Sequence, residues 1–409
     1  MTEFQRFSHL KVARFVFLVL SLEILGLGTL GVSVDSLAWG QVERPVPHNA
    51  SPFDKWDLDN DDRVSRQEIP EPLRVNFNRA DADRDGFISR EEDRAFRNRN
   101  NSGQRERTAA AQSSNPQRPA FREAIEVRAD LPYAGTDNVR QSLDLFLPKE
   151  RDSDEPLPLI IWIHGGGWRG GSKNGGIGQV GPLVSTGRYV GASVGYRLSD
   201  EAIWPAQIHD CKAAVRWLRA NADEYGIDPD RIGVWGSSAG GHLVAMLGVS
   251  GDVPQLEGEV GGSSDVSSCV QCVVDYYGPT DFLSMNNFDS NIDHDAVDSP
   301  ESLLVGGAIH ENKDAVRNAS PLTYVSENDP PFLIVHGTAD NLVPIDQSDQ
   351  LVAALEEANQ NVTYVKIEGG GHGRFASDEL LERVGTYFDL NLHGADVKIE
   401  GGTLPQGGR

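Results

Sequence analysis

Cysteine and methionine are scarce in this sequence of 409 residues, which has only 3 of each. So few cysteines exclude the disulfide framework on which small secreted domains depend. Cys269 and Cys272 flank two residues at the start of an apolar run, and in a strand they would lie on opposite faces, about 10 Å apart and too far to bridge. Cys211 fits an apolar helix face and is most simply a core residue. The chain is long enough for one large core and a smaller unit.

Positive charge is also scarce, and the formal net charge is −24. Residues 1–123 nearly balance, with 19 acidic against 18 basic side chains, whereas residues 124–409 carry 42 against 19. No Lys or Arg occurs between Arg231 and Lys313. Such a surface repels polyanions, so we expect no nucleic-acid partner.

The first forty residues read as a targeting segment. They begin with basic residues, continue with an apolar stretch from Phe15 to Val34 and end in small residues. This pattern predicts a secretory signal peptide over residues 1–40, hence a secreted or periplasmic protein with no stable membrane span after processing. A retained membrane anchor is the alternative, because the apolar run is long for a leader.

The remaining chain divides by composition. A spacer (41–52) precedes an acidic and Arg-rich module (53–96), and a polar linker (97–123) leads to the largest unit (124–393), which a polar tail (394–409) follows. In the largest unit apolar strands alternate with amphipathic helices, which predicts a mainly parallel eight-stranded sheet covered on both faces. The expected strands are 124–128, 142–147, 157–164, 189–196, 231–235, 270–277, 332–335 and 362–367, and the expected helices are 205–225, 239–248, 346–358 and 377–390.

Two acidic loops in the module match the calcium loop of an EF-hand. In residues 81–92, "DADRDGFISREE", oxygen-bearing side chains stand at positions 1, 3, 5, 9 and 12 and a glycine at position 6. Residues 57–68, "DLDNDDRVSRQE", repeat the pattern, but Asp62 replaces the glycine and makes this loop the weaker one. The sequence predicts a small all-α EF-hand-like module that binds structural Ca²⁺, in which Val64 and Ile88 pair. The expected ligands are Asp57, Asp59, Asp61, Ser65, Glu68, Asp81, Asp83, Asp85, Ser89 and Glu92. A solvated acidic segment is the alternative.

The stretch "RIGVWGSSAGGHLVAML" (231–247) contains a candidate nucleophile. "GSSAG" satisfies G-x-S-x-G only with Ser238 at its centre, and it stands between a strand and a helix, as a nucleophile elbow requires. Ser237 stands one residue before the central position of the motif. His242 lies on the same helix, so we expect it to be a packed or hydrogen-bonded residue rather than the base of Ser238.

Attack on a carbonyl carbon creates an oxyanion, which needs N–H donors already in place. Ala239 offers one at the start of a helix. Others are expected in "HGGGW" (164–168), directly after an apolar strand. A phosphate-binding loop is a poor alternative, because neither the G-x-G-x-x-G nor the Walker pattern is present.

The base and its orienting acid are expected farther along the chain. His372 in "EGGGHGRF" follows the last expected strand, and Asp340 in "VHGTADNLVP" follows the one before it. The order Ser238, Asp340, His372 is that of an α/β-hydrolase. Asp281 in "YYGPTDF" is a competing acid, and His336 is more simply structural.

The segments "HGGGWRGGSK", "GYRLS", "PAQIHDCKAAVRWLRANADEYGIDPDRIGVWGSSAGGH" and "PPFLIVHGTADNLVP" together resemble the α/β-hydrolase esterases related to hormone-sensitive lipases. The likeness is strongest to the bacterial feruloyl and acetylxylan esterase (BD-FAE-like) type and covers roughly residues 124–392. It implies Ser238 as nucleophile, His372 as general base and Asp340 as its orienter. The oxyanion would be held by the amides of Gly166, Gly167 and Ala239. A preceding EF-hand pair departs from the plain family pattern.

The resemblance implies a serine esterase that needs no cofactor for catalysis and acts on a small ester or an esterified glycan, such as an acetyl or feruloyl ester of plant or algal polysaccharide. The acidic insertion 281–303 favours neutral substrates, because an anion there would be repelled; a solvated acidic loop is the plainer interpretation. A serine peptidase, amidase or formamidase would use the same residues. A non-catalytic, calcium-dependent binding protein on the same scaffold is a further alternative.

Overall fold

The computed structural model of the chain describes residues 53, 56–59, 61–69, 77–96, 120–251, 253–373, 375 and 377–406. The predicted leader (1–40), the predicted spacer (41–52) and most of the predicted linker (97–119) lie outside these residues. Within the part of the chain that is described, no helix is long and apolar enough to cross a bilayer.

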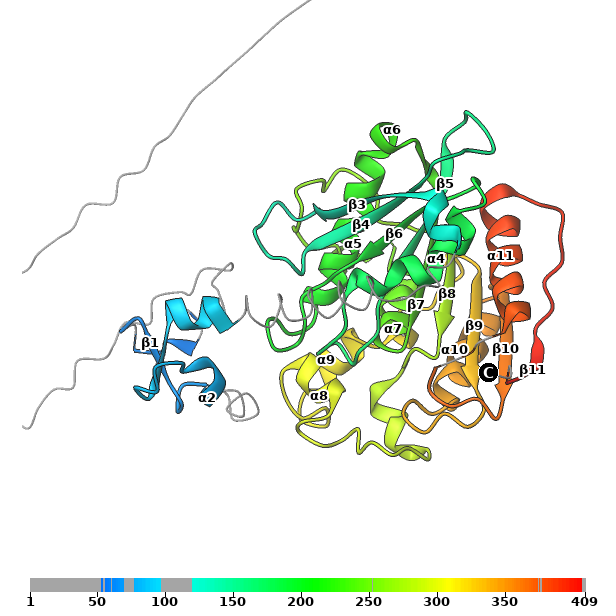
Figure 1. Cartoon of the computed structure of the whole chain (residues 1–409). Coiled ribbons are helices and arrows are strands. Elements are labelled where there is room, and N and C mark those ends of the chain that lie inside the picture. Colours follow the sequence, from blue (N-terminus) through cyan, green and yellow to red (C-terminus); the bar gives the residue numbers. More distant parts are fainter. Residues whose placement is uncertain are drawn as a thin grey trace, which may run out of the picture. The chain divides into compact units, whose positions relative to one another are not determined.

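A nine-stranded sheet forms the centre of the α/β unit, in the order β11-β10-β9-β8-β7-β5-β6-β4-β3 (Figure 1). Strand β4 is antiparallel to both of its neighbours, β3 and β6. Along the rest of the sheet, from β6 to β11, neighbouring strands are parallel. The sheet is therefore mainly parallel, as the sequence predicts. Its strands are β3 (Ile125–Pro132), β4 (Ser142–Pro148), β5 (Leu157–Ile163), β6 (Val190–Val194), β7 (Ile227–Ser237), β8 (Cys272–Tyr276), β9 (Phe332–Gly337), β10 (Val362–Glu368) and β11 (Gly402–Pro405).

The prediction of eight strands and a polar tail is wrong at the C-terminal end. Strand β11 lies within residues 394–409 and pairs in parallel with β10, from Val365↔Gly402 to Glu368↔Pro405. Of its four residues only Leu404 is buried, so the apolar pattern of a strand is almost absent there. The boundary at residue 124 is also late, because Phe121 in the 3₁₀ helix η2 (Ala120–Ala124) already packs against the core.

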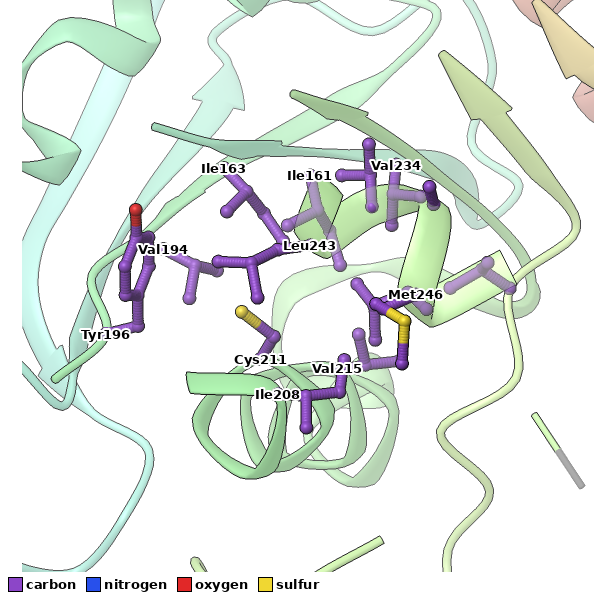
Figure 2. Close-up of a cluster of buried hydrophobic side chains, with 14 of the residues drawn as sticks. Ile161, Ile163, Val194, Tyr196, Ile208, Cys211, Val215, Val234, Leu243 and Met246 are labelled. Carbon is purple, nitrogen blue, oxygen red and sulfur yellow. The ribbon is translucent and has the colours of Figure 1, made fainter. Parts of the chain in front are cut away.

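The two faces of the sheet carry two separate apolar cores. Successive side chains of a strand point to opposite faces, and in β5 Ile161 and Ile163 enter one core whereas Ile160 and Trp162 enter the other. Figure 2 shows the first core, in which strand side chains meet those of α5 and α7. The helices are α4 (Gly176–Val184), α5 (Ala206–Ala220), α6 (Ala222–Tyr225), α7 (Ala239–Val249), α8 (Pro300–Val305), α9 (Lys313–Asn318), α10 (Asp346–Glu357) and α11 (Asp378–His393).

Helices α5, α7 and α10 contribute to the first core, and α4 and α11 to the second. Cys211 on α5 is buried in the first core, as predicted, and all three cysteines are free thiols. Both faces of the sheet are covered, so its parallel strands are buried. Because these strands run in the same direction, their carboxyl ends meet at one edge of the sheet, where ligands bind in such folds.

The N-terminal module has a short β-ladder as well as helical turns, so the prediction that it is all-α is wrong. Strands β1 (Arg63–Ser65) and β2 (Phe87–Ser89) are antiparallel, and Val64 pairs with Ile88 as the sequence predicts. Helix α2 (Phe77–Ala80) precedes the second acidic loop, and residues 90–96 are helical after it. Its small core consists of Phe53, Val64, Ile69, Phe77, Ala80 and Ile88.

Candidate active site

Ser238 lies in a sharp turn between β7 and α7. Its backbone angles are φ 55° and ψ −123°, which residues other than glycine rarely adopt. The turn is held by a hydrogen bond from the Ser238 N–H to the carbonyl of Tyr276 (2.8 Å), and the His242 N–H donates to the Ser238 carbonyl (2.9 Å). Such strain persists where the surrounding structure imposes it, typically at functional sites.

Only glycine fits on either side of this turn. A Cβ on Gly236 would lie 2.2 Å from the carbonyl oxygen of Gly240, and a Cβ on Gly240 would lie 2.1 Å from that of Ile163. Both distances are far inside van der Waals contact with backbone atoms that cannot move aside. The small residues of the motif therefore let the helix approach the strands closely.

Three loops bring a hydroxyl, an imidazole and a carboxylate together at the carboxyl edge of the sheet. The His372 Nε2 atom lies 3.0 Å from Ser238 Oγ, and its Nδ1 atom lies 2.7 Å from Asp340 Oδ2. Because an ionised carboxylate only accepts hydrogen bonds, Nδ1 carries the proton and Nε2 is free to accept one from the serine. This arrangement suits the hydroxyl for nucleophilic attack.

Asp340 is held in its ionised form. Burial alone would raise its pKa, but hydrogen bonds from His336, His372 and the Leu342 N–H outweigh it and keep the pKa of Asp340 well below its usual 3.8. The Leu342 and Val343 N–H groups donate to Asp340 Oδ1 at 2.9 and 3.1 Å. The carboxylate thus has a fixed orientation toward His372.

Asp281 and His336, the other candidates in the sequence, are not members of the chain from Ser238 to Asp340. Asp281 accepts a hydrogen bond from Leu283 N–H and caps the 3₁₀ helix η5 (Phe282–Asn287). His336 is fully buried, accepts from Ser348 Oγ–H (2.7 Å) and donates to the Val343 carbonyl (3.0 Å), so it supports the loop that carries Asp340.

The glycine-rich loop after β5 packs directly on the nucleophile turn. A Cβ on Gly165 would lie 2.6 Å from the Ser237 carbonyl oxygen and 3.2 Å from Ser238 Cβ. Gly166 and Gly167 have φ values of 118° and 58°, which favour glycine. Ala239 begins α7, so its N–H is at the positive end of that helix. The three predicted oxyanion-hole residues therefore belong to two segments that meet at Ser238.

Tyr277 is a residue of the site that the sequence did not predict. Its φ of 44° is unusual, and its ring lies 4.7 Å from that of His372 in a T-shaped arrangement. The signal available in the sequence was the run "DYYGP" at the end of a strand, but nothing in it distinguished Tyr277 from Tyr276.

The acidic insertion 281–303 borders the site. A Cβ on Gly167 would be 3.4 Å from Pro300, the first residue of α8. Near its middle the insertion is tied to the loop of Asp340, because Asn291 N–H donates to the Asn341 carbonyl (2.7 Å) and Ser290 Oγ–H to the Leu342 carbonyl (3.2 Å). The insertion therefore connects the loop of the acid with the oxyanion loop.

Within each of the two acidic loops of the module, the aspartate side chains lie close together. In each loop the first three aspartates, Asp57, Asp59 and Asp61 or Asp81, Asp83 and Asp85, have ligand atoms within 4.8 Å of one another. Asp62 adopts a φ of 63°, as Gly86 does with 92° at the same position of the other loop.

The last position of each loop is also in place, and one oxygen has no partner. Glu68 accepts from the N–H groups of Leu58 and Ser65, and Glu92 from those of Ala82, Asp83 and Ser89. Oδ1 of Asp81 is buried without a hydrogen-bond partner. Hard oxygen ligands around one point, including an unsatisfied buried oxygen, fit a calcium ion.

The fold and the hydrogen-bonded chain Ser238–His372–Asp340 define this protein as an α/β-hydrolase with a Ser-His-Asp site. Residues 143–355, more than half of the chain, match the BD-FAE family, and the chain belongs to that family.

Similar proteins agree with this assignment. The chain is 36% identical over 239 residues to the esterase LipC of Mycobacterium tuberculosis, covering 58% of each chain, and 32% identical over 250 residues to the esterase LipQ of the same organism, covering 60% of this chain and 56% of LipQ. Each match thus spans less than two thirds of the relative.

Solved structures include a truncated carbohydrate esterase from gut microbiota, with a TM-score of 0.60, 33% identity and coverage of 66% of this chain and 96% of that one. The butyrate-bound esterase Est2 of Thermogutta terrifontis has a TM-score of 0.53 and 25% identity, and the match covers 68% of this chain and 98% of that one.

Proposed function

We propose that this protein is a serine-dependent carboxylic ester hydrolase. The observation that carries the proposal is the continuous hydrogen-bonded chain from Ser238 Oγ through both nitrogens of His372 to Asp340. The relatives named as esterases support it. Secretion, inferred from residues 1–40, is part of the same proposal.

In the proposed reaction Ser238 Oγ attacks the ester carbonyl carbon while His372 Nε2 takes the hydroxyl proton. The amides of Gly166, Gly167 and Ala239 hold the oxyanion that forms. His372 then gives the proton to the departing alcohol as the C–O bond of the ester breaks and leaves an acyl-serine. Water attacks the acyl group with the same proton transfers and releases the acid.

We infer a neutral acyl group on a carbohydrate, such as an acetyl or feruloyl ester of a plant or algal polysaccharide, as the substrate. Two observations support this choice. The insertion beside the oxyanion loop contains acidic residues and no Lys or Arg, so a negatively charged acyl group would be repelled. One structural neighbour is named as a carbohydrate esterase.

We further propose that the two loops of the module bind Ca²⁺ in a structural role. The ligands would be Asp57, Asp59, Asp61, Ser65 and Glu68 in the first loop and Asp81, Asp83, Asp85, Ser89 and Glu92 in the second. Modules of this kind outside the cell bind calcium with dissociation constants of about 10⁻⁴ to 10⁻³ M. Such affinity suits a permanently bound ion where calcium is abundant.

A panel of neutral acetyl, butyryl and feruloyl esters, a peptide amide and a formamide tests the activity. We expect turnover of the esters by the wild-type protein and a loss of about 10⁴-fold or more with Ser238→Ala. Ser237→Ala is the matched control and should retain activity. Cleavage of the amide or formamide in preference to every ester would contradict the assignment as an esterase.

A further inference from the structure

The donors of the oxyanion hole come from two separate parts of the chain. Gly166 and Gly167 belong to the loop after β5, and Ala239 begins the helix after Ser238. A donor acts on the transition state only if it is already in position, and a displacement of about 1 Å costs about 10²-fold in rate. Something must therefore hold the loop and the helix in register.

A side-chain hydrogen bond joins these two parts directly behind the donors. The indole Nε1–H of Trp168, the residue after Gly167, donates to Nδ1 of His242, one turn after Ser238 on α7 (3.2 Å). The other ring nitrogen of His242, Nε2, lies 2.6 Å from the carbonyl oxygen of Ala319.

These two contacts fix the protonation of His242. An indole N–H only donates and a carbonyl oxygen only accepts, so Nδ1 must be bare and Nε2 must carry the hydrogen. The ring is neutral in this arrangement, and burial lowers the pKa of His242 to about 4, although the bond to the Ala319 carbonyl acts in the opposite direction. His242 therefore has one orientation in which both nitrogens are satisfied.

Aromatic rings surround the imidazole. The ring of Trp168 meets it edge-on at 5.1 Å, and those of Trp204 and Phe282 lie at 5.5 and 5.2 Å. Trp168 is 1% exposed and His242 is fully buried. The contact is thus dry, where a hydrogen bond is strong and its loss leaves an unsatisfied polar atom.

The backbone of Trp168 is itself held in an uncommon conformation. Its φ of 54° is unusual for a bulky residue, and its carbonyl accepts the N–H of Ser199 (2.8 Å). A residue adopts such a conformation where packing and hydrogen bonds impose it. In this loop the strained residue directly follows Gly167.

We propose that Trp168 and His242 are positioning residues that hold the glycine-rich loop in register with the nucleophile helix and so set the geometry of the oxyanion hole. Neither touches the reacting atoms. The proposal rests on the proposed ester hydrolysis, and it adds two residues on which the rate of that reaction depends.

The test compares two Trp→Phe variants from one aromatic cluster. Trp168→Phe removes the indole N–H that bonds to His242 and replaces the indole by a smaller ring, a change of volume that Trp204→Phe matches. Trp204→Phe removes an equivalent indole N–H, whose partner is Asn318 Oδ1 (2.7 Å), while its ring also packs on His242. Each variant loses one indole hydrogen bond, so the melting temperatures should fall by similar amounts.

With p-nitrophenyl acetate we expect kcat to fall about ten-fold or more in Trp168→Phe with KM within about two-fold of wild type, because the lost interaction acts in the transition state. Trp204→Phe should keep kcat within about two-fold. Equal kcat in the two variants, or a change in KM alone, would overturn the proposal. A wild-type protein without esterase activity would instead refute the proposed function.

A second pair tests His242 itself. In His242→Asn the amide oxygen can take the place of Nδ1 and accept from Trp168, whereas His242→Leu offers no acceptor. We expect the asparagine variant to retain at least about five-fold more kcat than the leucine variant when both are folded. Equal activities would contradict a positioning role, and if the leucine variant does not fold, the Trp168→Phe comparison decides.

Discussion

At the residue scale, the site is built on backbone conformations that side chains rarely adopt. Ser238, Tyr277 and Trp168 have φ values of 55°, 44° and 54° and lie at the nucleophile, beside the histidine and beside the oxyanion loop. Strained residues of this kind cost about 1–3 kcal/mol each and persist because the surroundings impose them. Close packing around the turn supplies that constraint.

Gly240→Ala tests how tightly the nucleophile turn is packed. An added Cβ would lie 2.1 Å from the Ile163 carbonyl oxygen, so we expect a loss of about 3 kcal/mol or more of unfolding free energy. Gly178→Ala on α4 is the control, because nothing lies within 4 Å of its added Cβ. The control should be neutral or stabilising in a melting experiment. Similar melting temperatures for both variants would contradict the packing argument.

The three residues of the Ser-His-Asp chain were predictable from sequence, because each stands just after an apolar strand and parallel strands end at one edge of the sheet. The bond between Trp168 and His242 was not predictable. It depends on how the loop after β5 and helix α7 pack against each other, and no periodicity in either segment encodes that contact.

At the element scale, the long helices and central strands follow from apolar periodicity, whereas short or polar elements do not. Helix α5 is amphipathic and was expected from its pattern, with α6 completing the expected 205–225 segment. Helices α8 and α9 are each 6 residues long, and β11 buries only Leu404. Such short elements are stabilised by packing against the folded core, and their own sequence does not show which residues will make those contacts.

The acidic loops allow a metal test with a matched pair. Glu92 stands at the last position of the second loop, where a glutamate side chain normally binds calcium through both oxygens. Glu91 beside it is exposed and is not at a ligand position. In titration calorimetry with CaCl₂ we expect Glu92→Gln to weaken calcium binding by about ten-fold or more and Glu91→Gln to leave it near wild type. Equal binding by the two variants, or no binding by the wild-type chain at millimolar calcium, would refute the site.

At the scale of the whole molecule, the protonation of buried groups makes stability depend on pH. Burial lowers the pKa values of His164 and His242 to about 4, and it raises that of Asp275 to about 7. Between about pH 4 and 6.5 the unfolded chain binds protons at the two histidines that the folded chain does not. Asp275 acts in the opposite direction, because it is protonated when folded and ionised when unfolded.

The unfolded chain gains more protons at the two histidines than the folded chain gains at Asp275. We therefore expect the melting temperature to rise with pH between about 4.5 and 6.5. Burial also lowers the pKa values of His209 and His393, which adds to this trend, and raises that of Glu201, which opposes it. Asp275→Asn should steepen the rise, because it removes one opposing group. A melting temperature that falls with pH over this range would contradict the account.

The central claim is that Ser238 is the nucleophile, and covalent labelling with a p-nitrophenyl alkylphosphonate tests it most directly. Chymotrypsin should release the peptide Gly236–Leu243, in which fragmentation in a mass spectrometer separates Ser237 from Ser238. We predict one adduct per chain, on Ser238, formed in step with the loss of esterase activity. An adduct on Ser237, or complete inactivation with Ser238 unmodified, would contradict the account.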